Sequence, residues 1–520
     1  MKKIATALLS CALSAATLAG CAANAAQVPQ ESQEPHTAAL TATAAASVKS
    51  PKYVFLFIGD GMSYPQIQST SDYLGALKDA DYWQAQPSLD DNQGAILDGP
   101  EYLNFMNFEA AGSAVTYDSN SFAPDSASTA TSISTGHKTH SGSINVDETG
   151  TIEYETIAEQ LKAQKGWEIG VITSVNLNHA TPAAFYAHQA SRSSYYEIGL
   201  ELVESGFDYF AGGGLLKPTG SSGDQTDLYE LAQEAGYTVA KTHAEADAIG
   251  TNTEKAIIID EDLADSDAMA YELDRTDDMW ALADYVAKGI EVLDNDTGFF
   301  MMCEGGKIDW ACHANDAASS IHDTQALADA VQVAIDFAKE HADETLILVT
   351  GDHETGGLTI GFAGTDYDTY LDLLENQKIS FAKYDSDYVA SYKANKTPFG
   401  TVLADIEKLF GLKAQGEEGD KLVLTAYEME QLRAAYEKSI NGTASSQYDQ
   451  AEYVLYGTYE PLSVTITHII NNKSGISFTS YSHTGLPVAV LAEGAGSEMF
   501  NGYYDNTDIY NKLADLLNIA

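Results

Sequence analysis

The sequence predicts an α/β protein: a three-layer α/β/α sandwich with a mostly parallel central sheet, plus an accessory insertion. Short apolar runs recur along the chain, as the buried strands of parallel sheets do. Helical patterns separate several of these runs, and such alternation places helices on both faces of one sheet. The runs cover residues 53–58, 167–174, 207–211, 299–303, 345–349 and 487–491, and the helical patterns include 154–164 and 317–341.

Polar motifs come directly after several of these runs. Asp60 follows the first strand, Glu304 follows the run at 299–303, and Asp352 follows the run at 345–349. Open α/β sheets bind their ligands beyond the carboxyl ends of parallel strands. The sequence therefore predicts a functional site at that edge of the sheet.

The N-terminal residues are typical of an export signal. Lys2 and Lys3 precede an apolar stretch that ends in Leu18-Ala19-Gly20-Cys21, the pattern of a signal peptide (residues 1–20) with a lipoprotein cleavage box. Cleavage there would leave the Cys21 thiol to be lipidated, and an ordinary cut near residues 22–25 is the alternative. Either cut predicts an exported protein, periplasmic or at the cell surface.

The next segment is poor in large apolar side chains. Residues 21–50 are mostly Ala, Thr, Ser, Gln and Pro, so they bury too little apolar surface to offset the entropy of ordering, and we expect a disordered tether. No later segment offers about 20 unbroken apolar residues, the length of a spanning helix. Attachment to the membrane is therefore expected only through the lipid on Cys21.

Composition excludes one class of partner. Hydrophobic residues make up 44% of the chain, which suits a soluble globular core. The formal net charge is -49, and loss of Lys2 and Lys3 would make it more negative. A general basic surface for nucleic acid is therefore not expected. Acidic surfaces usually serve solubility or salt adaptation.

Two cysteines remain beyond the N-terminal segment. Cys303 and Cys312 bracket the motif that starts at Glu304, so zinc thiolates are conceivable. Packing thiols are the favoured interpretation, because the neighbouring residues already offer oxygen and nitrogen ligands. A disulfide in an oxidising compartment stays open.

Five spaced motifs together resemble the alkaline phosphatase family. They are Gly59-Asp60-Gly61-Met62 with Asp125-Ser126-Ala127-Ser128, Glu304-Gly-Gly-Lys-Ile-Asp309-Trp310-Ala-Cys-His313, Gly351-Asp352-His353-Glu354, and Ser482-His483-Thr484-Gly485. The resemblance covers roughly residues 51–365 and 463–520. It implies an enzyme that holds three metal ions around a serine nucleophile.

Ser126 is the nucleophile that the resemblance implies. Small residues follow it and can start a helix on the sheet, and a helix N-terminus favours a phosphate and an alkoxide. An Asp-Ser pair alone is a common helix cap, so the family pattern carries this assignment. A serine hydroxyl needs activation, which a coordinated divalent metal can supply.

The family's metal ligands map onto three sets of residues. Asp309 and His313 are four residues apart, so on a helix they face the same way and can share a metal. Each zinc would have three protein ligands and an open position, as catalytic zinc requires. Hard oxygen ligands suit a third, octahedral magnesium. The implied sets are Asp309, His313 and His483 for the first Zn²⁺; Asp60, Asp352 and His353 for the second Zn²⁺; and Asp60, Glu304 and Thr181 for one Mg²⁺.

Arg192 has the family's spacing for the phosphate-binding arginine. The chain contains two other arginines, Arg275 and Arg433. A planar guanidinium can grip two phosphoryl oxygens, which lysine cannot imitate. The resemblance implies that Asp125 orients Arg192.

Two positions vary within the family. This chain has His179 and Trp310 where some members carry Asp and Lys. The resemblance is therefore to a His/Trp subgroup, and Co²⁺ or a water-filled site is the alternative to Mg²⁺ at the third position.

The resemblance also divides the chain into segments. It implies a core formed by residues 51–365 and 461–520, the second part carrying His483, with an accessory, crown-like insertion at 366–460. A second insertion is expected at about 72–104. Family analogy alone suggests a homodimer.

The implied activity is that of an exported, metal-dependent phosphomonoesterase. It would hydrolyse a broad range of phosphate monoesters through a phosphoserine and release inorganic phosphate. The second zinc would activate Ser126, and the first would stabilise the leaving oxygen and later activate the attacking water. A phosphodiesterase of the same superfamily is one rival, disfavoured by Glu304, Thr181 and Arg192. A phosphate-capturing protein on an inactive scaffold is the other, although each ligand residue of the family pattern is present.

Overall fold

The computed structural model describes residues 50–79, 97–442 and 444–519. The predicted signal peptide, Cys21 and residues 21–49 of the predicted tether lie outside these residues, as does the middle of the predicted insertion at 72–104. No helix among the described residues has both the length and the apolar character that crossing a membrane needs.

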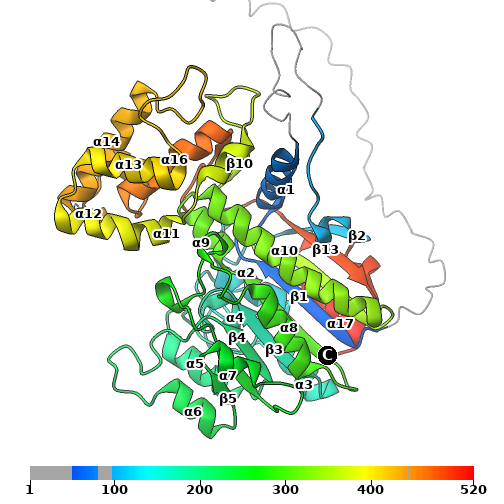
Figure 1. Ribbon diagram of the computed structural model, residues 1–520. Coiled ribbons are helices and arrows are strands. Elements are labelled where there is room, and N and C mark those ends of the chain that lie inside the picture. Colours follow the sequence, from blue (N-terminus) through cyan, green and yellow to red (C-terminus); the bar gives the residue numbers. More distant parts are fainter. Residues whose placement is uncertain (1–49, 80–96, 443, 520) are drawn as a thin grey trace, which may run out of the picture. The chain divides into compact units, whose positions relative to one another are not determined.

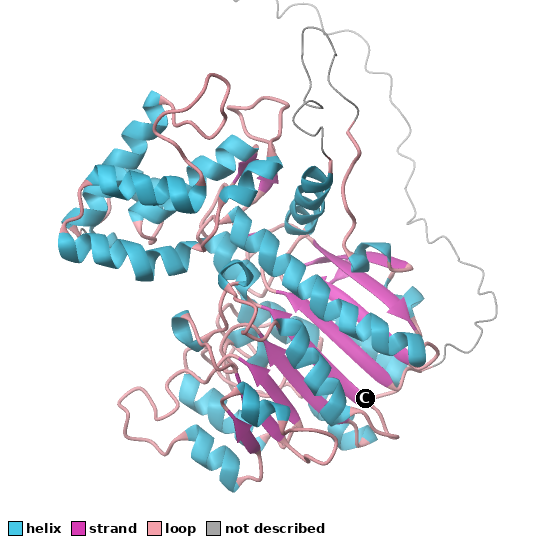
Figure 2. Cartoon of the chain, viewed as in Figure 1, coloured by secondary structure: helices cyan, strands magenta, loops and turns pink. Residues whose placement is uncertain are grey.

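A large sheet runs through the described residues (Figures 1 and 2). It has ten strands in the order β14-β2-β13-β8-β1-β7-β3-β4-β6-β5. The strands are β1 (Tyr53–Gly59), β2 (Ala110–Val115), β3 (Glu168–Thr173), β4 (Tyr209–Gly212), β5 (Thr238–Ala240), β6 (Ala256–Ile259), β7 (Phe299–Gly305), β8 (Thr345–Gly351), β13 (Val488–Gly494) and β14 (Gly502–Asp505). The six predicted apolar runs all fall on strands, so the predicted fold class is confirmed.

One predicted strand runs in the opposite direction to its neighbours. Strand β13 pairs antiparallel with both β2 and β8, whereas the other neighbouring strands pair in parallel. The run at 487–491 was therefore correctly predicted as a strand but wrongly as a parallel one. An apolar run reports burial on both faces and carries no information about strand direction.

The side chains of β1 show how two cores form on the two faces of the sheet. Val54, Leu56 and Ile58 belong to one apolar cluster, which also contains residues of α2 (Ser126–Thr135), α3 (Ile157–Lys165) and α17 (Thr507–Leu517). The alternate residues Tyr53, Phe55 and Phe57 belong to the other, with residues of α8 (Leu282–Leu293) and α10 (Ala317–Glu340). Successive side chains of a strand point to opposite faces, so each face of the sheet carries a layer of helices.

Figure 1 shows α8 and α10 over the face nearer the viewer. The helices of the two layers and their connections are α1 (Tyr64–Lys78), α2 (Ser126–Thr135), α3 (Ile157–Lys165), α4 (Ala180–Ala183), α5 (Tyr195–Glu204), α6 (Leu228–Glu234), α7 (His243–Asp247), α8 (Leu282–Leu293), α9 (Lys307–His313), α10 (Ala317–Glu340) and α17 (Thr507–Leu517). The helical patterns predicted at 154–164 and 317–341 correspond to α3 and α10.

Helices dominate the segment between β10 (Thr359–Ile360) and β11 (Ile476–Ser477), two short strands that pair with each other. They are α11 (Phe381–Tyr384), α12 (Ala390–Asn395), α13 (Phe399–Phe410), α14 (Ala426–Asn441), α15 (Gln450–Tyr456) and α16 (Pro461–Ser474). Their apolar cluster also includes Tyr73 of α1 and Ile321 of α10, so they share a core with the sheet's helices. The predicted boundaries at 366 and 460 stay predictions.

The motifs gather at the carboxyl ends of the parallel strands. Asp60 follows β1, Asp352 follows β8, and α9 follows β7 after a single residue. Two-residue strands β9 (Glu354–Thr355) and β12 (His483–Thr484) pair antiparallel, with His483 opposite Thr355. This pairing brings the most distant motif of the sequence to the same edge.

Candidate active site

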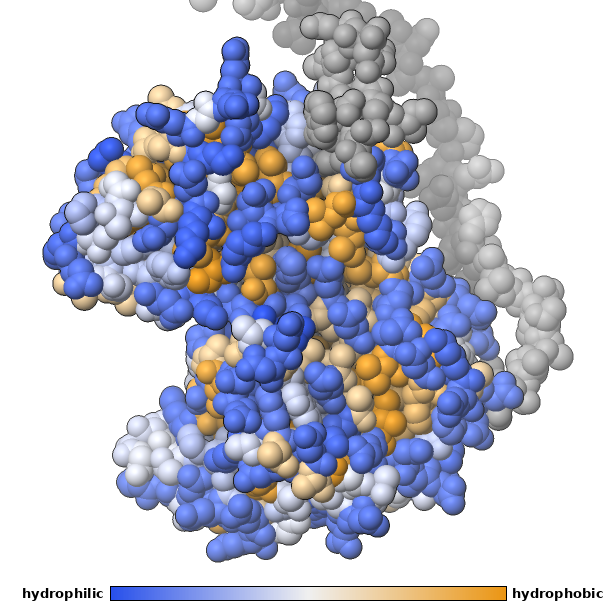
Figure 3. All heavy atoms as spheres, viewed as in Figure 1, coloured by the Kyte–Doolittle hydropathy of each residue, from blue (hydrophilic) through white to orange (hydrophobic). Residues whose placement is uncertain are grey.

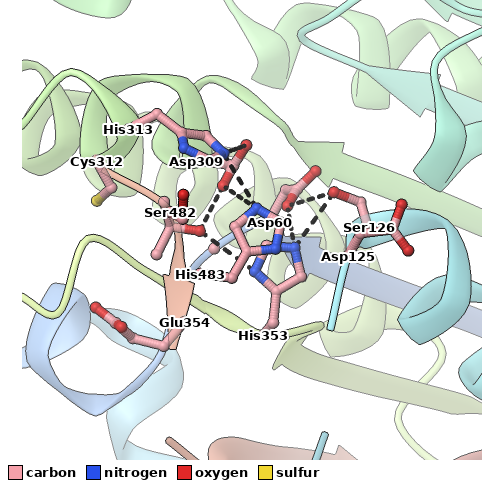
Figure 4. Close-up of polar contacts among 12 residues, drawn as sticks. Asp60, Asp125, Ser126, Asp309, Cys312, His313, His353, Glu354, Ser482 and His483 are labelled. Carbon is pink, nitrogen blue, oxygen red and sulfur yellow. Dashed lines mark hydrogen bonds and ion pairs between the residues drawn. The ribbon is translucent and has the colours of Figure 1, made fainter. Parts of the chain in front are cut away.

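Ser126 is the first residue of helix α2, and Asp125 is its N-cap. The Asp125 carboxylate accepts a hydrogen bond from the Ser128 backbone N–H at 3.1 Å, which fixes the start of the helix. Ser126 is 1% exposed. Its Oγ lies 3.2 Å from His353 Nε2 and 3.4 Å from Asp60 Oδ1 (Figure 4). The hydroxyl therefore sits where the helix N-terminus meets a histidine and a carboxylate.

The first predicted ligand set is brought together. Asp309 and His313 lie on one face of α9, and His483 reaches them from β12 (Figure 4). His313 Nε2 lies 3.1 Å from His483 Nε2 and 3.4 Å from Asp309 Oδ2. The donor atoms of the three residues are close enough together to share a metal ion.

Backbone carbonyls orient the two histidines of this set. His313 Nδ1 donates to Tyr481 O at 2.6 Å, and His483 Nδ1 donates to Pro124 O at 2.5 Å. A proton held on Nδ1 leaves the Nε2 lone pair of each neutral ring free. Metal-ligating histidines commonly use this arrangement.

The second predicted set, Asp60, Asp352 and His353, is completely buried and also close enough to hold a metal ion. Asp352 Oδ1 accepts from the Gly61 N–H at 3.1 Å and from the His353 N–H at 2.9 Å. His353 Nε2 lies 3.2 Å from Asp60 Oδ1. Burial raises the pKa of Asp352 to about 8 and that of Asp60 well above its usual range.

The third predicted set is formed around Asp60 and Glu304. Thr181 Oγ1 donates to Asp60 Oδ2 at 3.3 Å, and Asp60, Glu304 and His179 together have donor atoms close enough for a metal ion. Glu304 Oε2 accepts from Thr173 Oγ1 at 2.5 Å, but Glu304 Oε1 is buried without a hydrogen-bond partner. Burial raises the pKa of Glu304 to about 7.

These three sets fit divalent cations. Buried carboxylates are costly unless they are paired or coordinate metals, and here Asp60, Asp352 and Glu304 share one small buried region. The unpartnered Glu304 oxygen is the atom that a cation would satisfy. A histidine and carboxylate mixture suits zinc at the first two sets, and the oxygen-rich third set suits a harder ion.

Arg192 lies beside the serine helix. Its Nη1 donates to Asp125 Oδ2 at 2.8 Å, and its Nη2 lies 3.1 Å from His179 Nε2. Burial alone would raise the pKa of Asp125, but Arg192 outweighs it and lowers that pKa. The other arginines are engaged elsewhere: Arg275 pairs with Glu272, and Arg433 lies over the Phe399 ring.

Ser126 and Arg192 open into a pocket of about 390 Å³. Asp309, His313 and His483 also line it, together with His179 and Trp310, whose rings meet nearly at right angles with centroids 5.9 Å apart. The remaining lining residues are Asp265, Ser266, Tyr271, Phe381 and Tyr459. The pocket thus has a polar end and an aromatic side.

Several residues of this region were not predicted. Thr355 Oγ1 donates to Asp309 Oδ1 at 2.5 Å, and Thr129 Oγ1 donates to Asp352 Oδ2 at 3.1 Å. Thr355 follows His353 by two residues, a spacing that could have drawn attention to it. Thr129 lies one turn after Ser126. Both hydroxyls position carboxylates of the predicted ligand sets.

The two cysteines are packing thiols. Cys303 and Cys312 are both buried and free, so they form no disulfide with each other. Cys312 Sγ lies 3.3 Å from Ser320 Oγ, and burial raises the pKa of the Cys303 thiol well above its usual range. Neither is part of a cluster that could hold a metal among the described residues.

Comparison with known proteins agrees with this geometry. The sequence model of the family described as alkaline phosphatase matches residues 51–519. The chain belongs to the alkaline phosphatase family. Alkaline phosphatase 4 of Bacillus subtilis is 30% identical over 89% of this chain and 88% of its own length. Alkaline phosphatase 3 of the same organism is 30% identical over 88% of this chain and 87% of its own length.

Solved alkaline phosphatases share the fold. The cold-active alkaline phosphatase from Shewanella sp. has a TM-score of 0.70 at 27% identity and covers 89% of this chain and 99% of its own. The alkaline phosphatase of the Antarctic bacterium TAB5 has a TM-score of 0.60 at 25% identity, covering 91% of this chain and 99% of its own. The chain is therefore an alkaline phosphatase family enzyme, and its relatives support phosphomonoesterase activity.

Proposed function

We propose that this chain is an exported, metal-dependent phosphomonoesterase that acts on a broad range of phosphate monoesters through a phosphoserine at Ser126. The supporting observation is the position of Ser126 Oγ, which lies 3.2 Å from His353 Nε2 at the start of α2. Arg192 lies beside the same helix start through its ion pair with Asp125. The proposed nucleophile, the proposed phosphate clamp and the first proposed set of metal ligands thus line one pocket.

Three sets of residues would hold the metal ions. The proposed ligands are Asp309, His313 and His483 for one Zn²⁺; Asp60, Asp352 and His353 for a second Zn²⁺; and Asp60, Glu304 and Thr181 for one Mg²⁺. When bound, such ions lower the pKa of coordinated hydroxyls and neutralise charge that develops on oxygen.

The chain's own groups then carry the reaction. Ser126 Oγ forms a bond to phosphorus as the bond between phosphorus and the ester oxygen breaks. The proton of the Ser126 hydroxyl passes to the leaving ester oxygen, which becomes the alcohol. The N–H groups at the start of α2 and the Arg192 guanidinium neutralise the phosphoryl oxygens. Water next attacks the phosphoserine, breaks the Ser126 Oγ–phosphorus bond and supplies a proton to the serine oxygen, so that inorganic phosphate is released.

We propose that His179 and Trp310 set the metal preference of the third site, and that this chain belongs to the His/Trp subgroup. His179 lies with Asp60 and Glu304, and burial lowers its pKa to about 3, so the ring is neutral. In the TAB5 enzyme, a variant with glutamate in place of a histidine has Mg bound in its M3 site. A neutral ring supplies less negative charge than a carboxylate, so Co²⁺ or water stays an alternative to Mg²⁺ here.

The remaining proposals concern where the enzyme works. We propose that residues 1–20 direct export, that Cys21 carries a lipid that attaches the enzyme to the membrane, and that the enzyme works in the periplasm or at the cell surface. We also propose a homodimer, and a core at 51–365 and 461–520 with an insertion at 366–460. These proposals rest on the sequence motifs and on family analogy.

Two measurements test the proposed function. The first compares the rate of hydrolysis of an aryl phosphate monoester with that of the matching diester, and the second compares the wild type with the variant Ser126→Ala. We expect the wild type to favour the monoester strongly. Ser126→Ala should lower turnover by orders of magnitude with near-normal metal content, because only the nucleophile is lost. Preference for the diester would favour a phosphodiesterase, and an unchanged rate in Ser126→Ala would remove Ser126 as nucleophile. Absence of turnover of either ester by the metal-loaded wild type would favour the inactive scaffold.

A further inference from the structure

The pocket beside Ser126 has an aromatic side formed by four residues, which we call the aromatic wall: Tyr271, Trp310, Phe381 and Tyr459. Trp310 lies on α9, and Tyr271 lies between β6 and α8. Phe381 starts α11 and Tyr459 follows α15, so these two come from the predicted insertion. Trp310, Phe381 and Tyr459 are partly exposed, whereas Tyr271 is buried.

Three of the rings contact one another in sequence. The Tyr271 and Phe381 centroids are 5.7 Å apart at 66°, and the Phe381 and Tyr459 centroids are 5.9 Å apart at 81°. Both are edge-to-face arrangements, which the quadrupoles of aromatic rings favour. The rings therefore form a continuous surface that supports its own geometry.

Lys307 fixes the other end of the wall. Its ammonium lies 3.9 Å from the Tyr271 ring centroid and 4.8 Å from that of Trp310, and it pairs with Asp265 Oδ1 at 2.9 Å. The lysine side chain is completely buried. A cation between two ring faces attracts both, so Lys307 holds Tyr271 and Trp310 in place.

The position of Phe381 is fixed by the protein core. Its backbone N–H donates to Asp316 Oδ2 at 3.0 Å, and Asp316 is the N-cap of α10. The preceding Ser380 donates to both oxygens of Asp274, at 2.9 Å from N and 2.5 Å from Oγ. The backbone at Phe381 is thus held in place before a ligand arrives, which lowers the entropy cost of binding.

We propose that the aromatic wall binds a planar aromatic group carried by the alcohol part of the phosphate monoester. The inference rests on the proposed phosphomonoesterase activity and adds a preferred substrate class to it. Ser126 and Arg192 define the phosphoryl end of the pocket, so the alcohol part must extend along the remaining lining. That lining offers three accessible ring faces or edges, which complement another flat ring better than an aliphatic chain.

Three synthetic esters test the preference: 3-phenylpropyl, 3-cyclohexylpropyl and n-propyl phosphate. All three release a primary alcohol, so the bond-breaking chemistry is matched. We expect kcat/KM for the phenyl ester to exceed that for the cyclohexyl ester by about three- to tenfold, the range of one aromatic pair. Equal values for these two would overturn the inference and leave the proposed function intact. Hydrolysis of none of the three would overturn both.

Two variants locate the preference. Phe381→Leu and Tyr459→Leu keep an apolar side chain and remove a ring, so each should bring the phenyl-to-cyclohexyl ratio closer to one. The control is Tyr388→Leu, in the neighbouring π-helix Asp385–Val389. It removes a ring that stacks on Tyr384 of α11 and should keep the wild-type ratio. A ratio that falls equally in the control, or in no variant, would contradict the assignment.

A binding measurement covers the case in which a variant fails to fold. Calorimetric titration of the metal-loaded wild type with 3-phenylpropylphosphonate and 3-cyclohexylpropylphosphonate compares affinities without turnover. We expect the phenyl compound to bind about three- to tenfold more tightly. Equal affinity would overturn the inference.

Discussion

Asp125 and Arg192 form a 2.8 Å ion pair in which the carboxylate also caps the helix that begins at Ser126. Asp125 Oδ1 accepts from the Ser128 and Gly142 backbone N–H groups, which leaves Oδ2 for the arginine. One side chain therefore sets both the start of the helix that carries Ser126, the proposed nucleophile, and the direction of the guanidinium. A small displacement of Asp125 would misplace both groups.

Arg192→Lys should retain the charge and lose the planar grip. A hydrogen bond to a charged group contributes about 1.5–3 kcal/mol, so we expect kcat/KM for a monoester to fall roughly 10- to 100-fold and inhibition by inorganic phosphate to weaken. Initial rates and phosphate inhibition constants check this. Arg275→Lys is the matched control and should keep both values, because Arg275 pairs with Glu272 outside the pocket. Wild-type values in Arg192→Lys would assign that arginine to structure.

The proposed ligand sets predict how activity should respond when metal ions are removed or exchanged. A chelator should abolish activity, and zinc should restore it, with magnesium or cobalt raising it further. The double variant His179→Asp with Trp310→Lys adds a carboxylate near Glu304, so it should shift the preference of the third site toward magnesium. Metal analysis and activity titrations with each ion measure the shift. An unchanged preference would show that these two positions do not select the ion.

His188 gives a stability prediction at a position away from Ser126. Burial opposes protonation of His188, but its hydrogen bonds to Glu159 and Glu201 outweigh this and raise its pKa to about 10. Its other ring contact is the Tyr154 carbonyl. The folded-state pKa lies above the unfolded value of about 6.5, so the stabilisation is complete below pH 6.5 and is lost as pH rises toward 10.

His188→Gln should therefore lower the free energy of unfolding by about 2 kcal/mol at pH 6, and by progressively less as pH approaches 10. Urea unfolding of wild type and variant across this range measures the difference. The exposed His137 offers a control, and His137→Gln should lower the free energy of unfolding at pH 6 by less than His188→Gln does. A difference for His188→Gln that stays constant with pH would mean that its protonation does not contribute.

Salt should accelerate the turnover of a small anionic substrate. The chain carries a formal charge of -49, and polar and charged residues cover much of the face in Figure 3. Exposed charges act over about 10 Å at 0.1 M salt and about 30 Å at 0.01 M, so repulsion of a phosphate dianion is largest at low salt. We expect kcat/KM to rise as sodium chloride goes from low to moderate concentration, with metal, pH and viscosity held constant. A steady fall would show that attraction by Arg192 and the metal ions dominates the approach.

Sequence patterns predicted the layers of the fold better than its edges. The six apolar runs became strands because each is buried on both faces, as β1 and β8 are throughout. Strands β2, β5, β6 and β14 were not predicted, and β6 was missed although its four residues are apolar and buried. Ala110–Val115 is made of small residues, and Gly502–Asp505 lies at the sheet edge with Tyr503 exposed, so neither of these two strands shows a strong apolar signal. The antiparallel direction of β13 depends on long-range pairing that no local pattern contains.

The grouping of the site residues could be predicted because the motifs follow strands whose carboxyl ends share one edge. Their roles in catalysis and metal binding stay predictions. The aromatic wall could not be predicted, because Phe381 and Tyr459 reach the pocket only through packing of the helical segment on Asp316 and Asp274. Aromatic residues in an acidic, helix-rich insertion give no sign of which pocket they will line. Thr355 likewise becomes meaningful only once Asp309 lies beside it.

The position of β13 inside the sheet, between two strands from earlier parts of the chain, affects how the protein folds. Residues 488–494 lie between β2, which ends at Val115, and β8, which begins at Thr345. During synthesis, the sheet cannot be completed until nearly the whole chain has emerged, and His483 arrives only just before this strand. Contacts between residues so distant in the sequence form slowly, and until they form, the edges of β2 and β8 that pair with β13 stay unpaired. A chain truncated before residue 483 would therefore lack both β13 and His483, the last of the proposed metal-ligating histidines.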